Sequence, residues 1–266
     1  MSAIRVGAVQ YLNARPLVYG LEKQTNLFSI NFDVPSKCAR QLREGNVDLG
    51  LIPSIEYLRR PDYRIVPEIA VASKGQVASV ALFTSRPTQA IRSIAVDSSS
   101  KTAFALLRIL CAQWFEIEPK LHIMAPDLDS MLKRCDAALL IGDTALFTEH
   151  ETVVDLDKVD LGEEWTAMCG LPFVWAFWVG RNDVLTPDHV NALLTARDSG
   201  VQSLDAIVKS QKLADEDQVD IARAYLENNV YFSLLDDELS GLRRFYEAAL
   251  DVGVVPKNEA PLFYAS

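Results

Sequence analysis

A repeated order of apolar run, proline-containing turn and helical segment constrains what the first part of this chain can fold into. Apolar runs begin at Val6 and Val47, and an alternating run between them spans Phe28 to Val34. The prolines that follow these runs are Pro16, Pro35 and Pro53. Proline is favoured at the first position of a helix, because its missing N–H has no partner there anyway. This order predicts a β-α-β-α-β-α unit, with a parallel sheet and helices on its faces.

A second unit of the same kind starts at Ser93 and continues to an aromatic strand, Leu171 to Val179. We expect the chain to leave the first lobe near residue 86, between Thr84 and Ala90. It then builds a second α/β lobe over 87–180 and returns for a mainly helical segment over 181–266. The predicted fold class is therefore α/β with two lobes. Two crossings make a hinge, and the cleft between such lobes is the expected place for a ligand.

Four loops lead from a predicted strand to a predicted helix, so they should face this cleft. They are Tyr11–Asn13, Pro53–Ser54, Asp97–Thr102 and Ile141–Asp143. Their asparagine, serine and threonine side chains, together with backbone N–H groups at helix starts, can hold carboxylate or phosphate oxygens. The same residue types are also ordinary helix caps, and for any one loop both interpretations stay open.

Individual residues in these loops differ in what they can do. Asn13 can donate and accept hydrogen bonds but cannot titrate, and a helix cap is its alternative role. The run from Ser98 to Thr102, which includes Ser99, Ser100 and Lys101, has more polar groups than one cap needs and favours an anion site. Asp143 would cap a helix well, but it would repel an anionic ligand if it pointed into the cleft.

Several functional classes are disfavoured by composition and spacing. The net charge of −10 argues against nucleic acid and anionic membranes as partners. No apolar run approaches the roughly 18 residues that span a bilayer. The four cysteines and three histidines are scattered without metal-ligand spacing, and the dinucleotide fingerprint is absent, so we expect neither metal nor cofactor. The N-terminus enters a strand without a secretion pattern, which predicts a cytoplasmic protein.

Seven segments together resemble the chorismate dehydratase family of the futalosine route to menaquinone. The resemblance runs in order from about residue 4 to residue 183. The segments are Val9–Leu17, Gly45–Ser54, Ala78–Val80, Asp97–Thr102, Leu140–Leu146, Asp160–Trp165 and Gly170–Trp178. It implies a fold like the type 2 periplasmic binding proteins, which agrees with the two predicted lobes.

The resemblance also implies an activity, namely a hydro-lyase that converts chorismate into 3-[(1-carboxyvinyl)oxy]benzoate without a cofactor. Asn13 matches the family's catalytic asparagine, and Ser79 matches its substrate-binding serine. The family's carboxylate-binding loop matches Ser99, Ser100 and Thr102, and we add Ser54 and Asp143 from the cleft loops as binding candidates. The family often has arginine and serine where this chain has Lys101 and Ala103, and lysine lacks the bidentate fork of arginine.

The residues around Asn13 include no obvious base. Our hypothesis is that the enolpyruvyl carboxylate of the substrate takes the proton while Asn13 holds it. Two other functions stay open: a non-catalytic binding protein for a carboxylate or aromatic ligand, and a related enzyme of the same pathway, such as the one that processes dehypoxanthine futalosine. We expect a monomer or homodimer.

Overall fold

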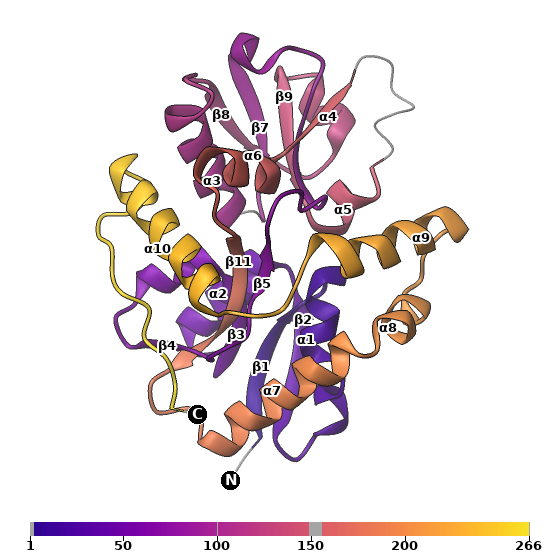
Figure 1. Cartoon of the computed structure of the whole chain (residues 1–266), viewed down its shortest axis with the longest axis vertical. Coiled ribbons are helices and arrows are strands. Elements are labelled where there is room, and N and C mark those ends of the chain that lie inside the picture. Colours follow the sequence, from indigo (N-terminus) through magenta and orange to yellow (C-terminus); the bar gives the residue numbers. More distant parts are fainter. Residues whose placement is uncertain (1–2, 100, 149–155, 266) are drawn as a thin grey trace.

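The computed structural model describes residues 3–99, 101–148 and 156–265, and the strands in these ranges form two sheets. Figure 1 shows the two sheets in two lobes, stacked along the long axis of the molecule. Each lobe combines strands with covering helices. The α/β class that the alternating segments predicted is confirmed.

The first sheet joins the N-terminal strands to a long strand from much later in the chain. β1 (Ile4–Val9) lies between β2 (Phe28–Asp33) and β3 (Leu49–Pro53) and is parallel to both. β11 (Phe173–Arg181) is antiparallel to β3, and it also pairs with β4 (Tyr63–Ile65) and β5 (Val71–Ser73). Because β11 enters from the other lobe, it starts at the edge where β3 ends. This sheet is therefore mixed, whereas the sequence pattern predicted a parallel one.

Short helical segments follow the strands of the first lobe, as the prolines predicted. The segment after β1 consists of the 3₁₀ turn η1 and the helix α1, and Pro16 lies in the first turn of α1. The elements are η1 (Leu12–Ala14), α1 (Arg15–Val18), η2 (Leu21–Lys23), α2 (Pro35–Glu44) and η3 (Ser54–Arg59).

The second sheet has the strand order β10-β6-β9-β7-β8. Its strands are β6 (Val80–Thr84), β7 (Ser93–Asp97), β8 (Lys120–Met124), β9 (Ala137–Ile141) and β10 (Asp157–Asp160). Its helical segments are η4 (Thr88–Ala90), α3 (Thr102–Gln113), α4 (Leu128–Leu132), α5 (Gly142–Leu146) and α6 (Leu161–Cys169). β7 and β9 are parallel, and their carboxyl ends lead to the starts of α3 and α5.

Both crossings between the lobes come earlier than the boundaries expected at 86 and 180. β6 pairs with β9 and β10, so the chain has already joined the second sheet at Val80. Likewise, β11 belongs to the first sheet from Phe173 onward. The apolar runs gave no indication of pairing partners, so β6 was assigned to the first lobe, and the aromatic strand expected as the return crossing pairs within the first sheet along its whole length.

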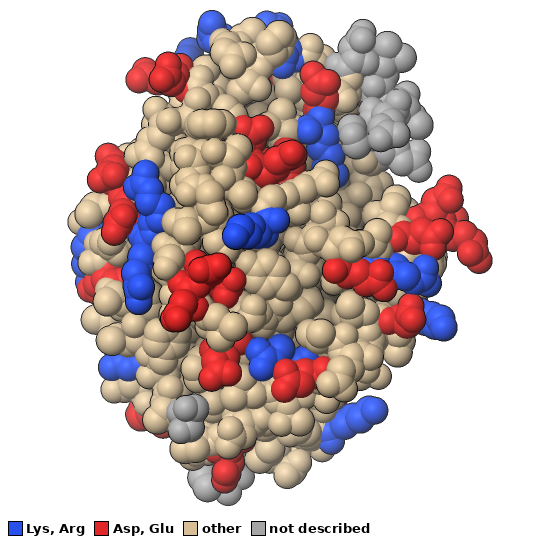
Figure 2. Space-filling view, viewed as in Figure 1, with Lys and Arg blue, Asp and Glu red and all other residues tan. Residues whose placement is uncertain are grey.

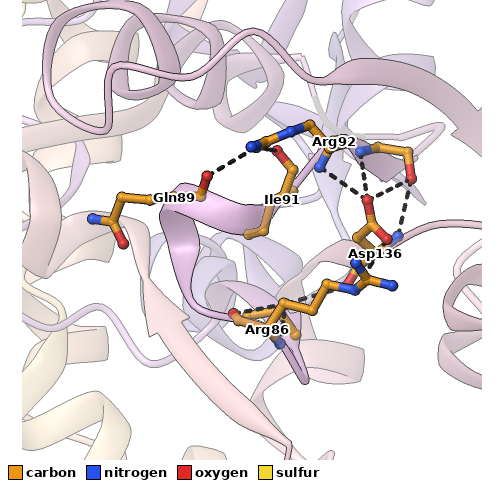
Figure 3. A network of polar contacts seen from close by, with 7 residues as sticks. Arg86, Gln89, Ile91, Arg92 and Asp136 are labelled. Carbon is orange, nitrogen blue, oxygen red and sulfur yellow. Dashed lines mark hydrogen bonds and ion pairs between the residues drawn. The ribbon is translucent and has the colours of Figure 1, made fainter.

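The segment expected to be the first crossing is instead a connection within the second lobe. Asp136 ties it to the start of β9: its Oδ2 accepts hydrogen bonds from the backbone N–H of Arg92 at 2.9 Å and of Ser93 at 3.0 Å. Arg86 pairs with Oδ1 at 3.2 Å (Figure 3). The Arg92 hydrogen bond is the largest cause that holds the pKa of Asp136 below its ordinary value. The stabilisation by this ionised group is lost only as the pH falls through that lowered pKa.

The C-terminal part is helical, as predicted, and contacts both lobes. Its elements are α7 (Pro187–Val201), α8 (Leu204–Ser210), α9 (Glu216–Ala224), the π-helical turn η5 (Tyr225–Asn229) and α10 (Asp236–Asp251). α7 packs on α1 so closely that a methyl group on Gly200 would lie 1.9 Å from the carbonyl oxygen of Pro16. α10 contacts β11 of the first lobe and α3 of the second.

Large aromatic side chains fill the region where the chain returns to the first lobe. Trp165 of α6, Phe173 of β11 and Phe245 of α10 are all less than 2% exposed. The Phe173 ring lies 5.3 Å from the Trp165 ring and 4.8 Å from the Phe245 ring, and both contacts are edge-to-face. Such contacts stabilise the junction by dispersion and by the ring quadrupoles. Within the described residues, no helix combines the length and apolar content that crossing a membrane requires.

Candidate functional site

A cavity with roughly 580 Å³ of empty space, its open mouth included, lies between the lobes. The ends of β1, β3 and β9 contribute to its wall, together with the start of α3 and parts of β5, β6 and β11. The lining residues are Val9, Tyr11, Asn13, Pro35, Leu51, Pro53, Val71, Ser79, Val80, Ser99, Lys101, Thr102, Ala103, Ile141, Gly142, Trp175 and Ala176.

Four of the residues expected in the site line this cavity: Asn13, Ser79, Ser99 and Thr102. They are far apart in the chain, and strand-to-helix connections at the facing edges of both sheets bring three of them together. Ser54 and Asp143 lie next to the cavity but are not among its lining residues. Ser100 lies outside the described residues.

Asn13 lies in η1, and a contact from the other lobe fixes this turn. Asp143, at the start of α5, accepts a hydrogen bond from the backbone N–H of Leu12 at 2.9 Å. Burial raises the pKa of the Asp143 carboxyl, and the Leu12 N–H partly opposes this rise. The carboxylate that would have repelled an anion thus makes a contact between the lobes, beside the asparagine that lines the cavity.

Ser79 is held by a strained turn immediately before β6. The Ser79 N–H donates to the carbonyl oxygen of Val77 at 2.7 Å, and Ala78 between them has φ of +61°. A three-residue turn with positive φ is rare and costs free energy, because it brings Cβ close to the backbone. Ser79 also accepts a hydrogen bond at its carbonyl oxygen from the Gly142 N–H, at 2.8 Å. The turn therefore attaches the serine to α5 of the second lobe.

The carboxylate of Asp160 compensates for this strain. It accepts hydrogen bonds from the backbone N–H groups of Val77 at 3.0 Å and Ala78 at 2.6 Å. It also caps α6 by accepting from the N–H groups of Gly162 and Glu163. Burial raises the pKa of Asp160, and these four N–H groups oppose the rise. One buried side chain thus fixes both the turn that carries Ser79 and the start of a helix.

Asp160→Asn should therefore destabilise the protein by about 2 to 4 kcal/mol, because an amide N–H₂ would face one of the four N–H donors. We expect the melting temperature to fall by roughly 5 to 10 °C. Asp127→Asn is the matched control, since Asp127 caps α4 by accepting a hydrogen bond from the Ser130 N–H and is exposed. Thermal unfolding measures both variants, and equal shifts would contradict this role of Asp160.

The loop from Asp97 to Thr102 differs from the expected row of hydroxyl donors. Ser99 donates its hydroxyl hydrogen to Asp97 Oδ1 at 2.7 Å, and its N–H donates to the same oxygen at 2.8 Å. Burial is the largest influence on the pKa of Asp97 and raises it. The Ser99 oxygen can therefore only accept further hydrogen bonds, and the Tyr11 hydroxyl lies 3.4 Å from it. In the described part of this loop, the groups that could still hold an anion are the backbone N–H groups at the start of α3 and the Lys101 ammonium.

Ser54 joins this loop to the first lobe from behind the cavity wall. It is fully buried, and its hydroxyl donates to the Val174 carbonyl oxygen at 2.7 Å. Thr102 Oγ1 lies 3.4 Å from the Ser54 hydroxyl and accepts a hydrogen bond from the Ile55 N–H at 3.3 Å. These contacts hold the start of α3 against β11 and η3.

Three aromatic residues in or next to the cavity wall were not among the predicted site residues. Tyr11 and Trp175 line it, and the Tyr225 hydroxyl lies 2.8 Å from Ser79 Oγ. Tyr11 could have been predicted as a site residue, because it lies in the same strand-to-helix loop as Asn13. Trp175 was visible only as part of an aromatic strand, and Tyr225 lies in a helical segment without a chemical motif.

The cavity is nearly uncharged. Among its described lining residues, Lys101 is the one cation, and there is neither carboxylate nor histidine. The described residues contain no group of three or more histidine, cysteine or acidic side chains arranged to hold a metal ion. Figure 2 shows acidic and basic side chains interspersed over the face displayed, without an extended basic patch. The described cavity wall thus offers a ligand one ammonium group, neutral hydrogen-bond donors and aromatic surfaces.

Comparisons with known proteins agree with this geometry. A chorismate dehydratase of Thermus thermophilus is 30% identical, over 97% of both chains. A crystal structure of an Archaeoglobus fulgidus protein superimposes with a TM-score of 0.76 and 16% identity, over 96% of this chain and 99% of that one. A Candida albicans protein with the generic periplasmic binding protein fold gives a TM-score of 0.68 and 13% identity, over 97% and 92%. The two-lobed fold predicted from the sequence is confirmed.

A sequence profile of a family described as menaquinone biosynthesis matches residues 4–251, which is most of the chain. The match includes every described residue discussed above as part of the site. With the cavity between two lobes and the relative of nearly equal length, this match shows that the chain belongs to the menaquinone biosynthesis family.

Proposed function

We propose that the protein removes water from chorismate and releases 3-[(1-carboxyvinyl)oxy]benzoate. The main support for this proposal is that Asn13 and Ser79 line the same cavity. In addition, the chain matches a chorismate dehydratase over nearly its whole length. The protein would accordingly be a hydro-lyase. Asn13 is the proposed catalytic residue, and Ser79 is the proposed binding residue next to it.

The charge of the cavity suits the substrate. Chorismate has one carboxylate on a small unsaturated ring and a second on its enolpyruvyl ether. Lys101 and the N–H groups at the start of α3 can receive one carboxylate, and Asn13 with Ser79 can receive the other. Trp175 and Tyr11 provide apolar surface for the ring. A cavity wall without a carboxylate avoids repulsion of a doubly negative ligand.

The reaction needs one proton removed and one hydroxyl lost. The proton leaves the ring carbon that bears the enolpyruvyl ether, and its electron pair enters the ring as hydroxide leaves the neighbouring carbon. Proton and hydroxide together make the water released, and the ring becomes aromatic, so the driving force lies in the substrate. The described cavity wall has no carboxylate or histidine to act as base. We therefore assign proton removal to the enolpyruvyl carboxylate, which Asn13 orients.

Incubation with chorismate in the absence of added cofactor tests this function. We expect a time-dependent product with the mass of chorismate minus one water and the absorbance of a 3-substituted benzoate. Protein-free chorismate is the control, because spontaneous breakdown gives other products. Binding of chorismate without turnover would instead support a non-catalytic binding protein, and absence of both would refute the proposed substrate.

A further inference from the structure

The hydroxyl of Tyr225 reaches the site from the C-terminal helices. Tyr225 is 2% exposed and begins the π-helical turn that follows α9. Its phenol oxygen lies 2.8 Å from Ser79 Oγ, and the Asn13 side chain lies close enough to the phenol to lower its pKa. Tyr225 is not among the lining residues, so it contacts the two residues that face the cavity from behind. π-Helical turns occur frequently at functional sites.

The Tyr225 hydroxyl is therefore next to both side chains, Ser79 by a hydrogen bond and Asn13 through its influence on the phenol. Burial is the largest cause of the raised pKa of Tyr225, which keeps the phenol neutral, with a single hydrogen to donate. If Tyr225 donates to Ser79, the Asn13 amide donates to the phenol oxygen, and the Ser79 hydrogen is directed elsewhere. If Tyr225 donates to Asn13 Oδ1, Ser79 donates to the phenol and the Asn13 N–H₂ group is free. Either arrangement leaves at least one neutral donor group available to a carboxylate in the cavity.

We propose that Tyr225 is a positioning residue, whose hydroxyl holds the Asn13 amide and the Ser79 hydroxyl in fixed orientations toward the substrate. This inference rests on the proposed function. Asn13 lies in the first lobe, and Ser79 lies in the crossing to the second, so one phenol contacts both the first lobe and the crossing. A site made of neutral donors depends on their orientation, because no net charge compensates for a misdirected dipole.

Tyr225→Phe tests the inference because it removes only the hydroxyl. We expect kcat for chorismate dehydration to fall by about 10- to 100-fold, with KM changed by less than about threefold. In a Ser79→Ala background, Tyr225→Phe should cost clearly less, because the two changes remove the same contact. Tyr57→Phe is the matched control, since Tyr57 is also buried but its hydroxyl contacts Ala260 and Leu262 near the C-terminus.

A Tyr225→Phe enzyme with kcat within twofold of the wild type would overturn the inference. So would additive effects with Ser79→Ala, or a loss of kcat matched by Tyr57→Phe and by an equal fall in melting temperature, which would indicate a merely structural hydroxyl. If Tyr225→Phe does not fold, the Asn13–Ser79 coupling decides the matter: Asn13→Ser and Ser79→Ala must then be non-additive in kcat, and additivity refutes the bridge. A wild-type protein without dehydratase activity overturns the proposed function itself, and this inference with it.

Discussion

Asn13→Ala is expected to lower kcat for chorismate dehydration by about 100- to 1000-fold while leaving the affinity for chorismate nearly unchanged. The expected size is that of losing one preorganised donor at a site of charge rearrangement. Affinity should persist because Lys101, Ser79 and the start of α3 remain in place. Steady-state kinetics measures kcat, and calorimetric titration of the inactive variant with chorismate measures the affinity.

Two further variants sharpen this test. Asn46→Ala removes an asparagine that contacts only the exposed Glu44 side chain through its amide, and it should leave kcat unchanged. Asn13→Asp keeps the size but places a second negative charge beside the substrate carboxylate, so both kcat and affinity should fall. Full activity of Asn13→Ala would refute the catalytic role, and a loss confined to affinity would make Asn13 a binding residue only.

The alternation of apolar strands and helical segments in the sequence was sufficient to predict where the loops that contain Asn13 and Thr102 lie. Each follows a short apolar strand and precedes a helix, and strand ends of this kind meet at one edge of a sheet. The lobe boundaries could not be predicted from the sequence. The apolar run before Thr84 and the aromatic run after Leu171 contain no feature that indicates which strand they pair with. Which sheet such a strand joins depends on contacts between residues far apart in the chain.

The direction in which a polar side chain points could not be predicted from the sequence either. Ser54 and Ser99 have the same chemistry as Ser79, but one donates to the Val174 carbonyl oxygen and the other to Asp97. Asp143 follows a strand end as expected, yet its carboxylate contacts the Leu12 N–H rather than a ligand. Tyr225 is the clearest case, because only the packing of the C-terminal helices against both lobes brings its hydroxyl to Ser79.

Gly142 is the backbone position on which the cavity wall depends most directly. It has φ of +63°, and a methyl group there would lie 2.7 Å from Cδ2 of the Tyr11 ring. Its N–H also donates to the Ser79 carbonyl oxygen. The absence of a side chain therefore lets the Tyr11 ring lie directly against the backbone of the second lobe, next to the turn that contains Asn13. A substitution here should affect geometry at three lining residues at once.

Gly142→Ala is accordingly expected to lower kcat/KM by about 10- to 100-fold, since Tyr11 must move into the cavity or the lobes must separate. It should also destabilise the fold by roughly 1 to 2 kcal/mol, because alanine is strained at positive φ. Gly170→Ala is the matched control: Gly170 has φ of +74° but no atom within 4 Å of an added methyl group. The control should show the same loss of stability in thermal unfolding and retain its kcat/KM. Equal activity losses in the two variants would mean that backbone strain, rather than collision with Tyr11, accounts for the effect.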